Sequence, residues 1–417
     1  MIQTVDNTRT IPLSNPDITN DDIMAVVNVL RTSRLSLGPK LGEFEEKFAA
    51  YTGSRFAVAV NSGTAGLHLA VKSLGIGEND AVITSPFSFI ASANCLLYES
   101  AVPVFVDIEP RTFNLDVEKV GEFLREHCRR EPGTGIPVDR VTGRRIRAIL
   151  PVHVFGHPCE MAGIMALAGE FGLSVIEDSC EALGAEYRGR KAGTIGDAGV
   201  FAFYPNKQMT TGEGGMILTD SESVASLCKS FRNQGRDMQG GWLDHSRLGY
   251  NYRLSDISCA LGISQLGRID HILWKRSVAA AHYTKALGDI VFTPATVAGS
   301  KRSWFVYVVC LPGELQGLRD FVLEELTRRG IGCNNYFPPI HLQSFYRNRF
   351  GYREGMFPVA ESVAGRTIAL PFHSNCSREE IDYVALTLRE ILQELRRTAG
   401  EVSQPFVPAF GHSAAGV

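Results

Sequence analysis

The 417-residue sequence lacks several features that would assign it to a specialised class of protein. Its longest apolar runs, such as 148–155, are far shorter than the roughly 20 residues of a membrane span. Residues 1–18 are polar and contain no apolar core of a signal peptide. The net charge is −3, which gives no bulk attraction to nucleic acid or to an anionic membrane. We therefore expect a cytoplasmic protein without a nucleic-acid or membrane partner.

Three other kinds of site also lack support in the sequence. The nine cysteines are dispersed without a Cys-x-x-Cys pair, which favours reduced thiols over a disulfide framework. Cysteine and histidine do not cluster at the spacing of metal ligands, so we expect no metal site. The strand expected at 56–60 is not followed by a GxGxxG motif, which argues against a nicotinamide-dependent enzyme.

What the sequence does contain is a regular alternation of short apolar segments and helical patterns. Thr19 or Asn20 is expected to cap a helix that reaches Arg31. Apolar strands separated by helices predict an α/β fold, with a largely parallel sheet that helices cover on both faces. The strands are expected at 56–60, 81–84, 102–106, 148–152, 173–176, 200–204 and 216–218.

The chain is too long for one simple core and predicts more than one domain. The expected parts are an N-terminal arm (1–18), a large domain (19–270), a small C-terminal α+β domain (271–399) and a tail (400–417). Residues 128–147 are basic and rich in turn residues, and they predict a surface loop. An arginine patch that grips phosphates is the alternative reading of that segment.

A lysine and an aspartate indicate the chemistry. Asp178 closes an apolar strand, and Lys207 follows on a loop just before the glycine-rich run 212–215. This is the layout that a pyridoxal phosphate (PLP) enzyme needs. The lysine forms a Schiff base with the cofactor aldehyde, and the aspartate keeps the pyridine nitrogen protonated so that the ring accepts electrons.

Two further motifs come in the order that such a site requires. Residues 61–66 lie between a strand and a helix, where backbone N–H groups suit a phosphate. Residues 87–89 follow another strand end and offer an aromatic ring for stacking. Taken alone, the first is as well explained by a simple bend and the second by a core aromatic. The conjunction with Asp178 and Lys207 favours the functional reading.

On these motifs the chain resembles the sugar-nucleotide aminotransferases of the DegT/DnrJ/EryC1/StrS family, from about residue 11 to residue 392. The resemblance implies the PLP-dependent aspartate aminotransferase fold (fold type I), with a mostly parallel seven-stranded sheet and a smaller C-terminal α+β domain. The motifs that carry it are 33–39, 61–65, 86–94, 177–184, 204–207, 212–215 and 249–253.

The resemblance also implies roles for single residues. Lys207 and Asp178 are the catalytic pair, and Phe89 stacks on the cofactor ring. The cofactor phosphate is bound by Gly63, Thr64 and Ala65. Asn251 reaches the phosphate in a neighbouring subunit, which implies a homodimer with active sites shared across the interface.

Two positions depart from many relatives. Glu181 lies where glutamine is common near the ring hydroxyl, so the local charge changes. Ala202 replaces a serine that often binds phosphate, and the missing hydroxyl contact is expected to weaken cofactor binding by about 1 kcal/mol unless another donor substitutes.

The implied reaction moves an amino group from an amino acid, expected to be glutamate, to a keto-deoxy sugar nucleotide. Related dehydratases carry histidine in place of the lysine, so Lys207 favours transamination. Residues 204–208 and 335–341 are most similar to enzymes of the perosamine synthase type, which aminate C4. Amination at C3, a different nucleotide and a non-catalytic PLP-binding regulator stay open as alternatives.

The substrate's diphosphate requires cations or other donors. The candidates are Arg34, Lys40, Arg247 and Arg253, each of which has an ordinary surface or ion-pair role as its alternative. From the small domain, Tyr336, His341 and His373 are candidates for contacts with the sugar, beside a structural role for each histidine.

Overall fold

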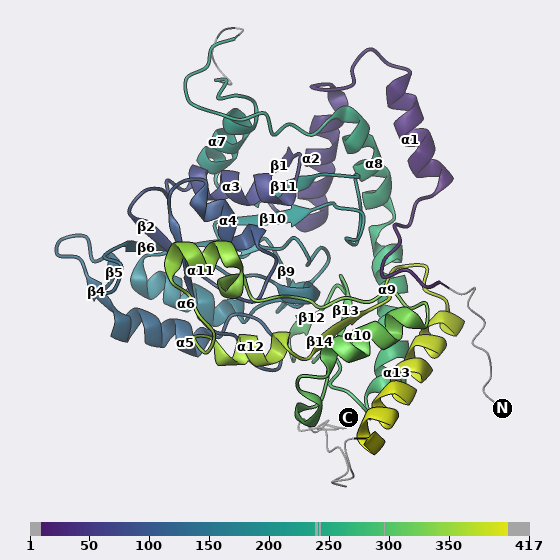
Figure 1. The fold of residues 1–417 in the computed structure, drawn as a ribbon. Coiled ribbons are helices and arrows are strands. Elements are labelled where there is room, and N and C mark those ends of the chain that lie inside the picture. The colour runs from purple at the N-terminus through teal and green to yellow at the C-terminus, as the bar shows by residue number, and fades with distance from the viewer. Residues whose placement is uncertain (1–9, 238–240, 242, 296, 399–417) are drawn as a thin grey trace, which may run out of the picture.

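The computed structural model describes residues 10–237, 241, 243–295 and 297–398 (Figure 1). The predicted tail and the first half of the predicted arm lie outside these residues. The described end of the arm is tied to the C-terminal part of the chain, because Ile11 pairs with Ile331. The amide of Ile11 donates to the carbonyl of Gly330 at 2.9 Å, and the amide of Gly332 donates back to the carbonyl of Ile11 at 2.8 Å.

A central sheet runs through the larger part of the described chain. Its main path has the strand order β1-β11-β10-β7-β6-β2-β3. Neighbours from β10 to β3 are parallel, whereas β11 is antiparallel to both of its neighbours. The prediction of a mostly parallel seven-stranded sheet is confirmed along this path. The strands are β1 (Phe56–Val60), β2 (Asp80–Thr84), β3 (Val102–Phe105), β6 (Arg145–Leu150), β7 (Ser174–Asp178), β10 (Ala198–Ala202) and β11 (Gly215–Thr219).

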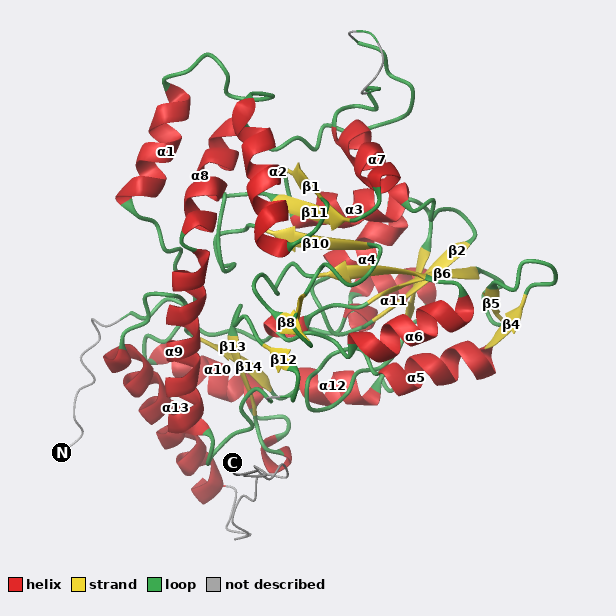
Figure 2. Ribbon diagram, turned by 180° about the vertical axis from the view of Figure 1, so that it is seen from behind, coloured by secondary structure: helices red, strands yellow, loops and turns green. Residues whose placement is uncertain are grey.

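Helices cover both faces of the sheet, which explains why its strands are nearly continuous apolar runs. Alternate residues of β1 show the division, since Val58 and Val60 pack with α3, α4 and α7 while Ala57 and Ala59 pack with α2 and α8. Figure 2 shows α1 and α8 side by side, with α2 next to α8. These helices are α1 (Asn20–Leu30), α2 (Pro39–Thr52), α3 (Gly63–Ser73), α4 (Ala91–Leu97), α5 (Val117–Glu122), α6 (Met161–Phe171), α7 (Glu222–Arg232) and α8 (Asp256–Gly267).

A second core lies in the C-terminal part, where α10 and α13 pack around a two-stranded antiparallel sheet (Figure 1). The long helix α9 (Ile269–Leu287) leads into it and contributes to its core. The predicted α+β character is therefore confirmed, and the boundary at residue 270 stays a prediction. The elements are β13 (Tyr307–Cys310), α10 (Arg319–Arg328), α11 (Ser344–Phe350), α12 (Pro358–Ala364), β14 (Thr367–Leu370) and α13 (Arg378–Thr398).

Smaller elements complete the described fold. β12 (Ser300–Lys301) pairs with β8 (Glu186–Tyr187), which also pairs with β9 (Arg190–Lys191). Short helical turns occupy Phe123–His127, Val154–Gly156, Gly313–Leu315 and Ile340–Leu342. In the described chain, no helix is both long enough and apolar enough to cross a membrane.

The predicted surface loop at 128–147 is wrong in part. β4 (Cys128–Arg130) and β5 (Pro137–Asp139) form an antiparallel hairpin there, and β5 joins the central sheet beside β6. Charged side chains concealed this pattern, because only Cys128, Val138 and a few neighbours are buried. Charged residues also hid the start of β6, which begins at Arg145 and not at the predicted residue 148. The guanidinium of Arg145 lies 3.0 Å from the carboxylate of Asp80.

The end of β7 is held by an unusually well-bonded carboxylate. The side chain of Glu177 is fully buried and accepts hydrogen bonds from the amides of Gly193, Ile195 and Gly196 at 2.6–2.8 Å. The fourth contact is His153, whose Nε2 lies 3.0 Å away. Because the amide of Cys159 donates to His153 Nδ1, the ring proton is on Nε2 and points at Glu177.

Candidate active site

The predicted catalytic pair faces one cavity of about 710 Å³, a volume within the range of small-molecule sites. The sheet topology explains why the two side chains face the same cavity. Asp178 is the last residue of β7, and its register partner is Val200 near the end of the parallel neighbour β10. The loop that follows β10 then carries Lys207 back across the strand ends. The lining residues belong to the segments 62–64, 89–92, 178–181, 202–207, 213–214 and 334–338, together with Leu67, Val152 and Phe305.

The Asp178 carboxylate is buried and oriented by two donors. Ser92, on α4, donates its hydroxyl to Oδ2 at 2.6 Å. The amide of Cys180 donates to Oδ1 at 3.1 Å. Two fixed hydrogen bonds hold the carboxylate in one orientation at the cavity wall while leaving acceptor capacity for a further N–H donor.

Lys207 reaches the same cavity from the opposite side. Its Nζ lies 3.4 Å from Glu181 Oε1 and 3.8 Å from the centre of the Phe305 ring. The Lys207 backbone is also fixed, because its amide donates to the carbonyl of Tyr204 and its own carbonyl accepts from Arg276. The amine is therefore held between a carboxylate and an aromatic face.

Glu181 is the third ionisable group of the cavity. Its Oε2 accepts from the amide of Phe155 at 2.9 Å, and its own backbone carbonyl accepts from Gln208 at 2.6 Å. Burial raises the pKa of Glu181 above its ordinary value, although the charge of Lys207 acts in the opposite direction.

Replacing Glu181 with glutamine is expected to make the stability of the cofactor-free protein less dependent on pH. Because the folded-state pKa of Glu181 is raised, its stabilising contribution is complete below the unfolded pKa and is lost as pH rises through the folded value. The Tm of the variant relative to the native protein should rise by about 1–3 °C from about pH 5 to pH 8. Thermal melts followed by circular dichroism measure this difference.

The exposed Glu126→Gln is the control for simple removal of a carboxylate. A relative Tm of Glu181→Gln that falls with rising pH would contradict the direction of the shift.

The predicted phosphate turn begins α3. Ser62 is its N-cap, and the Ser62 hydroxyl accepts from the amide of Ala65 at 3.1 Å. Gly63 and Thr64 line the cavity, whereas Ala65 is buried and does not. Glycine is required at 63, since a Cβ there would lie 2.7 Å from the Cβ of Ala202. The amides of Gly63 and Thr64 remain as first-turn donors at the cavity wall.

The two aromatic residues after β2 have different surroundings. Phe87 is fully buried and packs against Phe113, Phe155 and Phe337, as a core aromatic does. Phe89 lines the cavity and keeps 61% of its surface exposed, so its ring face is open to a planar partner.

The C-terminal part of the chain contributes the facing wall. Tyr336 lines the cavity there, stacked on Phe337 with ring centres 5.0 Å apart. Asn334 and Asn335 lie beside it in the same lining.

The remaining sequence candidates lie outside the cavity lining. Three have partners elsewhere: Lys40 Nζ pairs with Glu43, Arg247 donates to the hydroxyl of Ser230 and Arg253 donates to Asn233. Arg34 and Asn251 are exposed. His341 and His373 are buried outside the lining, and Nε2 of His341 lies 2.9 Å from Glu361 because the ring packs into a core beside Phe357.

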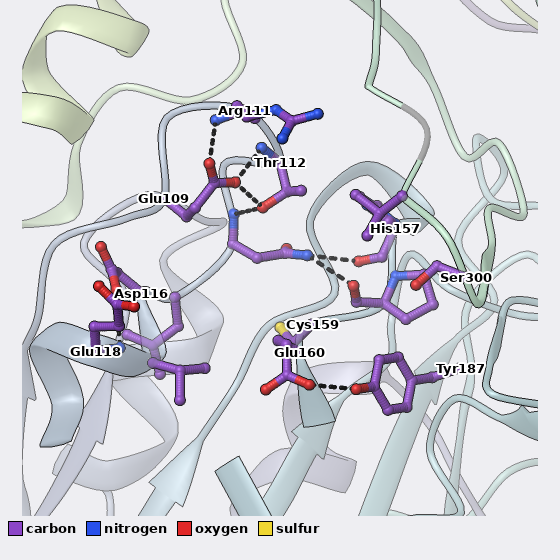
Figure 3. Close-up of a pocket in the computed structure, with 15 residues that line it drawn as sticks. Glu109, Arg111, Thr112, Asp116, Glu118, His157, Cys159, Glu160, Tyr187 and Ser300 are labelled. Carbon is purple, nitrogen blue, oxygen red and sulfur yellow. Dashed lines mark hydrogen bonds between the residues drawn. The ribbon is translucent and has the colours of Figure 1, made fainter. Parts of the chain in front are cut away.

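A second cavity of about 390 Å³ lies near α5 and contains none of the predicted site residues (Figure 3). Three of its acidic side chains, Glu109, Asp116 and Glu160, already accept local hydrogen bonds. Glu109 accepts from the amides of Arg111 and Thr112, and Glu160 accepts from the hydroxyl of Tyr187. These bonds are structural caps, so this cavity does not compete with the first as the active site.

Sequence reasoning missed two side chains that complete the catalytic cavity. Ser92 was available in the 86–94 motif, three residues after Phe89 and thus near the same side of a helical turn. Phe305 had no such signal, because about a hundred residues separate it from Lys207 and only tertiary packing brings the two together.

Comparison with known proteins agrees with this geometry. The sequence model of the DegT/DnrJ/EryC1/StrS aminotransferase family matches residues 16–389. GDP-perosamine synthase of Caulobacter vibrioides is 35% identical, over 92% of this chain and 98% of its own.

Two solved structures are similar in fold and sequence. PseC, a Helicobacter pylori aminotransferase involved in the biosynthesis of pseudoaminic acid, has a TM-score of 0.83 and 28% identity, covering 93% of this chain and all of its own. DesV of S. venezuelae, solved in complex with a ketimine intermediate, has a TM-score of 0.78 and 32% identity, covering 92% and 95%. With the predicted catalytic pair facing one cavity and the family model matched over most of this chain, the chain belongs to the DegT/DnrJ/EryC1/StrS aminotransferase family and is a PLP-dependent sugar aminotransferase.

Proposed function

We propose that this protein transfers the amino group of an amino acid, with glutamate as the expected donor, to C4 of a keto-deoxy sugar nucleotide. The observation that carries the proposal is the cavity in which Asp178, Glu181 and Lys207 converge. The C4 position and the sugar class are supported by the similarity of residues 204–208 and 335–341 to enzymes of the perosamine synthase type.

The residues of the cavity fit PLP. Gly63 and Thr64 offer first-turn amides of α3 for its phosphate, and Phe89 offers an open ring face for stacking. The Asp178 carboxylate, already fixed by Ser92, would accept from the protonated pyridine nitrogen. When bound there, PLP supplies an electron sink for the carbanion that forms at the donor's Cα.

Lys207 is the group that we assign to proton transfer. Its amine would hold the cofactor through the cofactor's aldehyde group between turnovers. Placed beside Glu181 and Phe305, the same amine would accept the proton from the donor's Cα and return it later in the reaction. The same residue works in reverse when the keto sugar enters.

Asp178→Asn is expected to lower kcat by on the order of 10²–10³-fold while leaving the fold intact. Asparagine has the same size and keeps one acceptor oxygen for the amide of Cys180, while its NH2 group faces the hydroxyl of Ser92, but it removes the negative charge that faces the pyridine nitrogen. Steady-state kinetics with a saturating donor measure the loss. An unchanged kcat would contradict the role assigned to Asp178.

A second copy of the chain is needed to complete the site. Among the described residues that line the cavity, Lys207 is the only lysine or arginine. A cofactor phosphate and a substrate diphosphate together require more cations or donors than that. We infer that Asn251 of a second copy reaches this cavity, with Arg247 and Arg253 near it, and that each active site is shared across a dimer interface.

The proposed reaction is tested by incubating the purified protein with PLP, glutamate and a panel of GDP-, UDP- and dTDP-linked keto sugars. Conversion of C=O to CH–NH2, seen by mass spectrometry and positioned by NMR, is the expected result for a 4-keto sugar. If only 3-keto sugars are converted, the position of amination is C3 and the proposed C4 position is wrong. An absorption spectrum that no amino donor changes would favour a non-catalytic PLP-binding regulator.

A further inference from the structure

Asn251 lies between two tyrosines that anchor its backbone. The rings of Tyr250 and Tyr252 stack with centres 5.0 Å apart and an interplanar angle of 13°. Both are partly buried, whereas Asn251 is exposed. The tyrosines therefore hold the segment to its own subunit and leave Asn251 directed outward.

A partly buried carboxylate binds the first of these tyrosines. Glu99, just after α4, accepts from the hydroxyl of Tyr250 at 3.0 Å. It also lies 2.7 Å from His68 Nε2 and 2.7 Å from Lys72 Nζ, both on α3. Burial by itself would raise the pKa of Glu99. The hydrogen bonds from Lys72 and His68 lower it by more, so the pKa of Glu99 lies below its ordinary value. Glu99 is thus an ionised centre with three donors.

His68 extends the same network to the second tyrosine. Only 2% of His68 is exposed, and burial lowers its pKa, so the ring is neutral. A neutral ring that donates from Nε2 to Glu99 has its acceptor on Nδ1, which lies 3.3 Å from the hydroxyl of Tyr252. Both tyrosine hydroxyls are therefore tied, directly or through His68, to Glu99.

The backbone of the segment is held by a neighbour of the phosphate turn. The amide of Asn61 donates to the carbonyl of Tyr252 at 2.9 Å, and its side-chain amide donates to the carbonyl of Asn251 at 3.4 Å. Asn251 therefore has little freedom to move unless the tyrosines move with it.

We propose that Glu99 and His68 are positioning residues that set the orientation in which Asn251 meets the cofactor phosphate of a second copy. The inference rests on the shared active site proposed above. A buried network of this kind is costly to leave half-satisfied, so loss of one member releases the tyrosine that it holds. Loss of a network residue in one subunit should therefore weaken cofactor binding in the partner's active site and not in the site of the same subunit.

Hybrid dimers test the inference. One copy keeps Lys207 and the other carries Lys207→Ala, so that each hybrid has one site able to bind PLP covalently. Glu99→Gln is placed either on the Lys207→Ala copy (trans) or on the copy with Lys207 (cis). The PLP dissociation constant of the live site is read from the fraction of cofactor that borohydride fixes on Lys207.

The expected result is an asymmetry. In the trans hybrid, the PLP dissociation constant should rise by about tenfold, which is the size of one lost phosphate contact. In the cis hybrid, it should stay within about twofold of the native value. Tyr252→Phe, which removes a single hydroxyl of the network, should give the same asymmetry even if Glu99→Gln fails to fold. Tyr98→Phe is the matched control, because Tyr98 contacts His68 through its ring edge.

Equal losses in cis and trans would reduce the network to a general structural role and overturn the inference. The trans Asn251→Ala hybrid separates this failure from that of the shared site. If Asn251→Ala weakens binding in trans and the network variants do not, only the positioning role falls. If Asn251→Ala has no effect in trans, or no dimer forms, the shared site itself is wrong and the inference falls with it.

Discussion

Replacing Lys207 with alanine is expected to lower kcat for amino transfer by at least 10²–10⁴-fold, the contribution of a positioned acid–base group. The variant should also lose the yellow absorbance band that borohydride removes, since Lys207 is the only lysine among the described residues that line the cavity. Stopped or continuous assays with glutamate and the reactive keto sugar measure the rate, and the absorption spectrum measures covalent attachment of PLP.

Lys47→Ala is a suitable control for this experiment, because Lys47 is an exposed helical lysine paired with Glu43. It should retain full activity and the yellow band. A Lys207→Ala protein that keeps both the band and the activity would exclude Lys207 as the covalent and proton-transferring residue.

The second large effect concerns stability. Glu177→Ala is expected to reduce the free energy of unfolding by about 3–5 kcal/mol, because it removes the buried acceptor that three backbone amides and His153 share. Each amide left without a partner carries its own desolvation cost. Urea unfolding of the cofactor-free protein, followed by circular dichroism, measures the loss.

The control is Glu170→Ala, which removes a half-exposed carboxylate paired with Arg125 at 2.9 Å. Exposed pairs contribute little, so its loss should stay below about 1 kcal/mol. Glu177→Gln keeps one acceptor oxygen, so its loss in the free energy of unfolding should lie between those of Glu177→Ala and Glu170→Ala. A Glu177→Ala protein as stable as Glu170→Ala would show that the buried network does not support the fold.

The adjacent acids at the end of β7 illustrate how one strand serves both stability and chemistry. Successive side chains of a strand point to opposite faces. Glu177 therefore turns into the protein to hold residues 193–196, while Asp178 turns to the cavity to meet Ser92. The hydrogen bonds of Glu177 hold the end of β7 and so keep Asp178 in place. The proposed contact with a ring nitrogen requires such a fixed carboxylate.

Much of the site could be predicted because its residues occupy strand ends and helix starts that leave a local signal. Asp178, Gly63 and Thr64 each follow an apolar strand, and parallel strand ends meet at one edge of the sheet. Thr19 likewise caps α1 with the predicted side-chain hydrogen bond. The β4–β5 hairpin was missed because its exposed charges hide the short alternating pattern on which strand prediction depends.

By itself, the sequence determined the α/β architecture and the family, and it singled out Lys207 and Asp178 as the proposed catalytic pair, since these depend on apolar periodicity and on motifs only a few residues long. The tertiary structure alone decided what surrounds Lys207, why Glu177 is structural and where His341 and the arginines lie. Those answers rest on contacts between residues that are about 20 to about 100 positions apart in the sequence. Such contacts are set by packing of the whole chain, which leaves no trace in the residues on either side of any one of them.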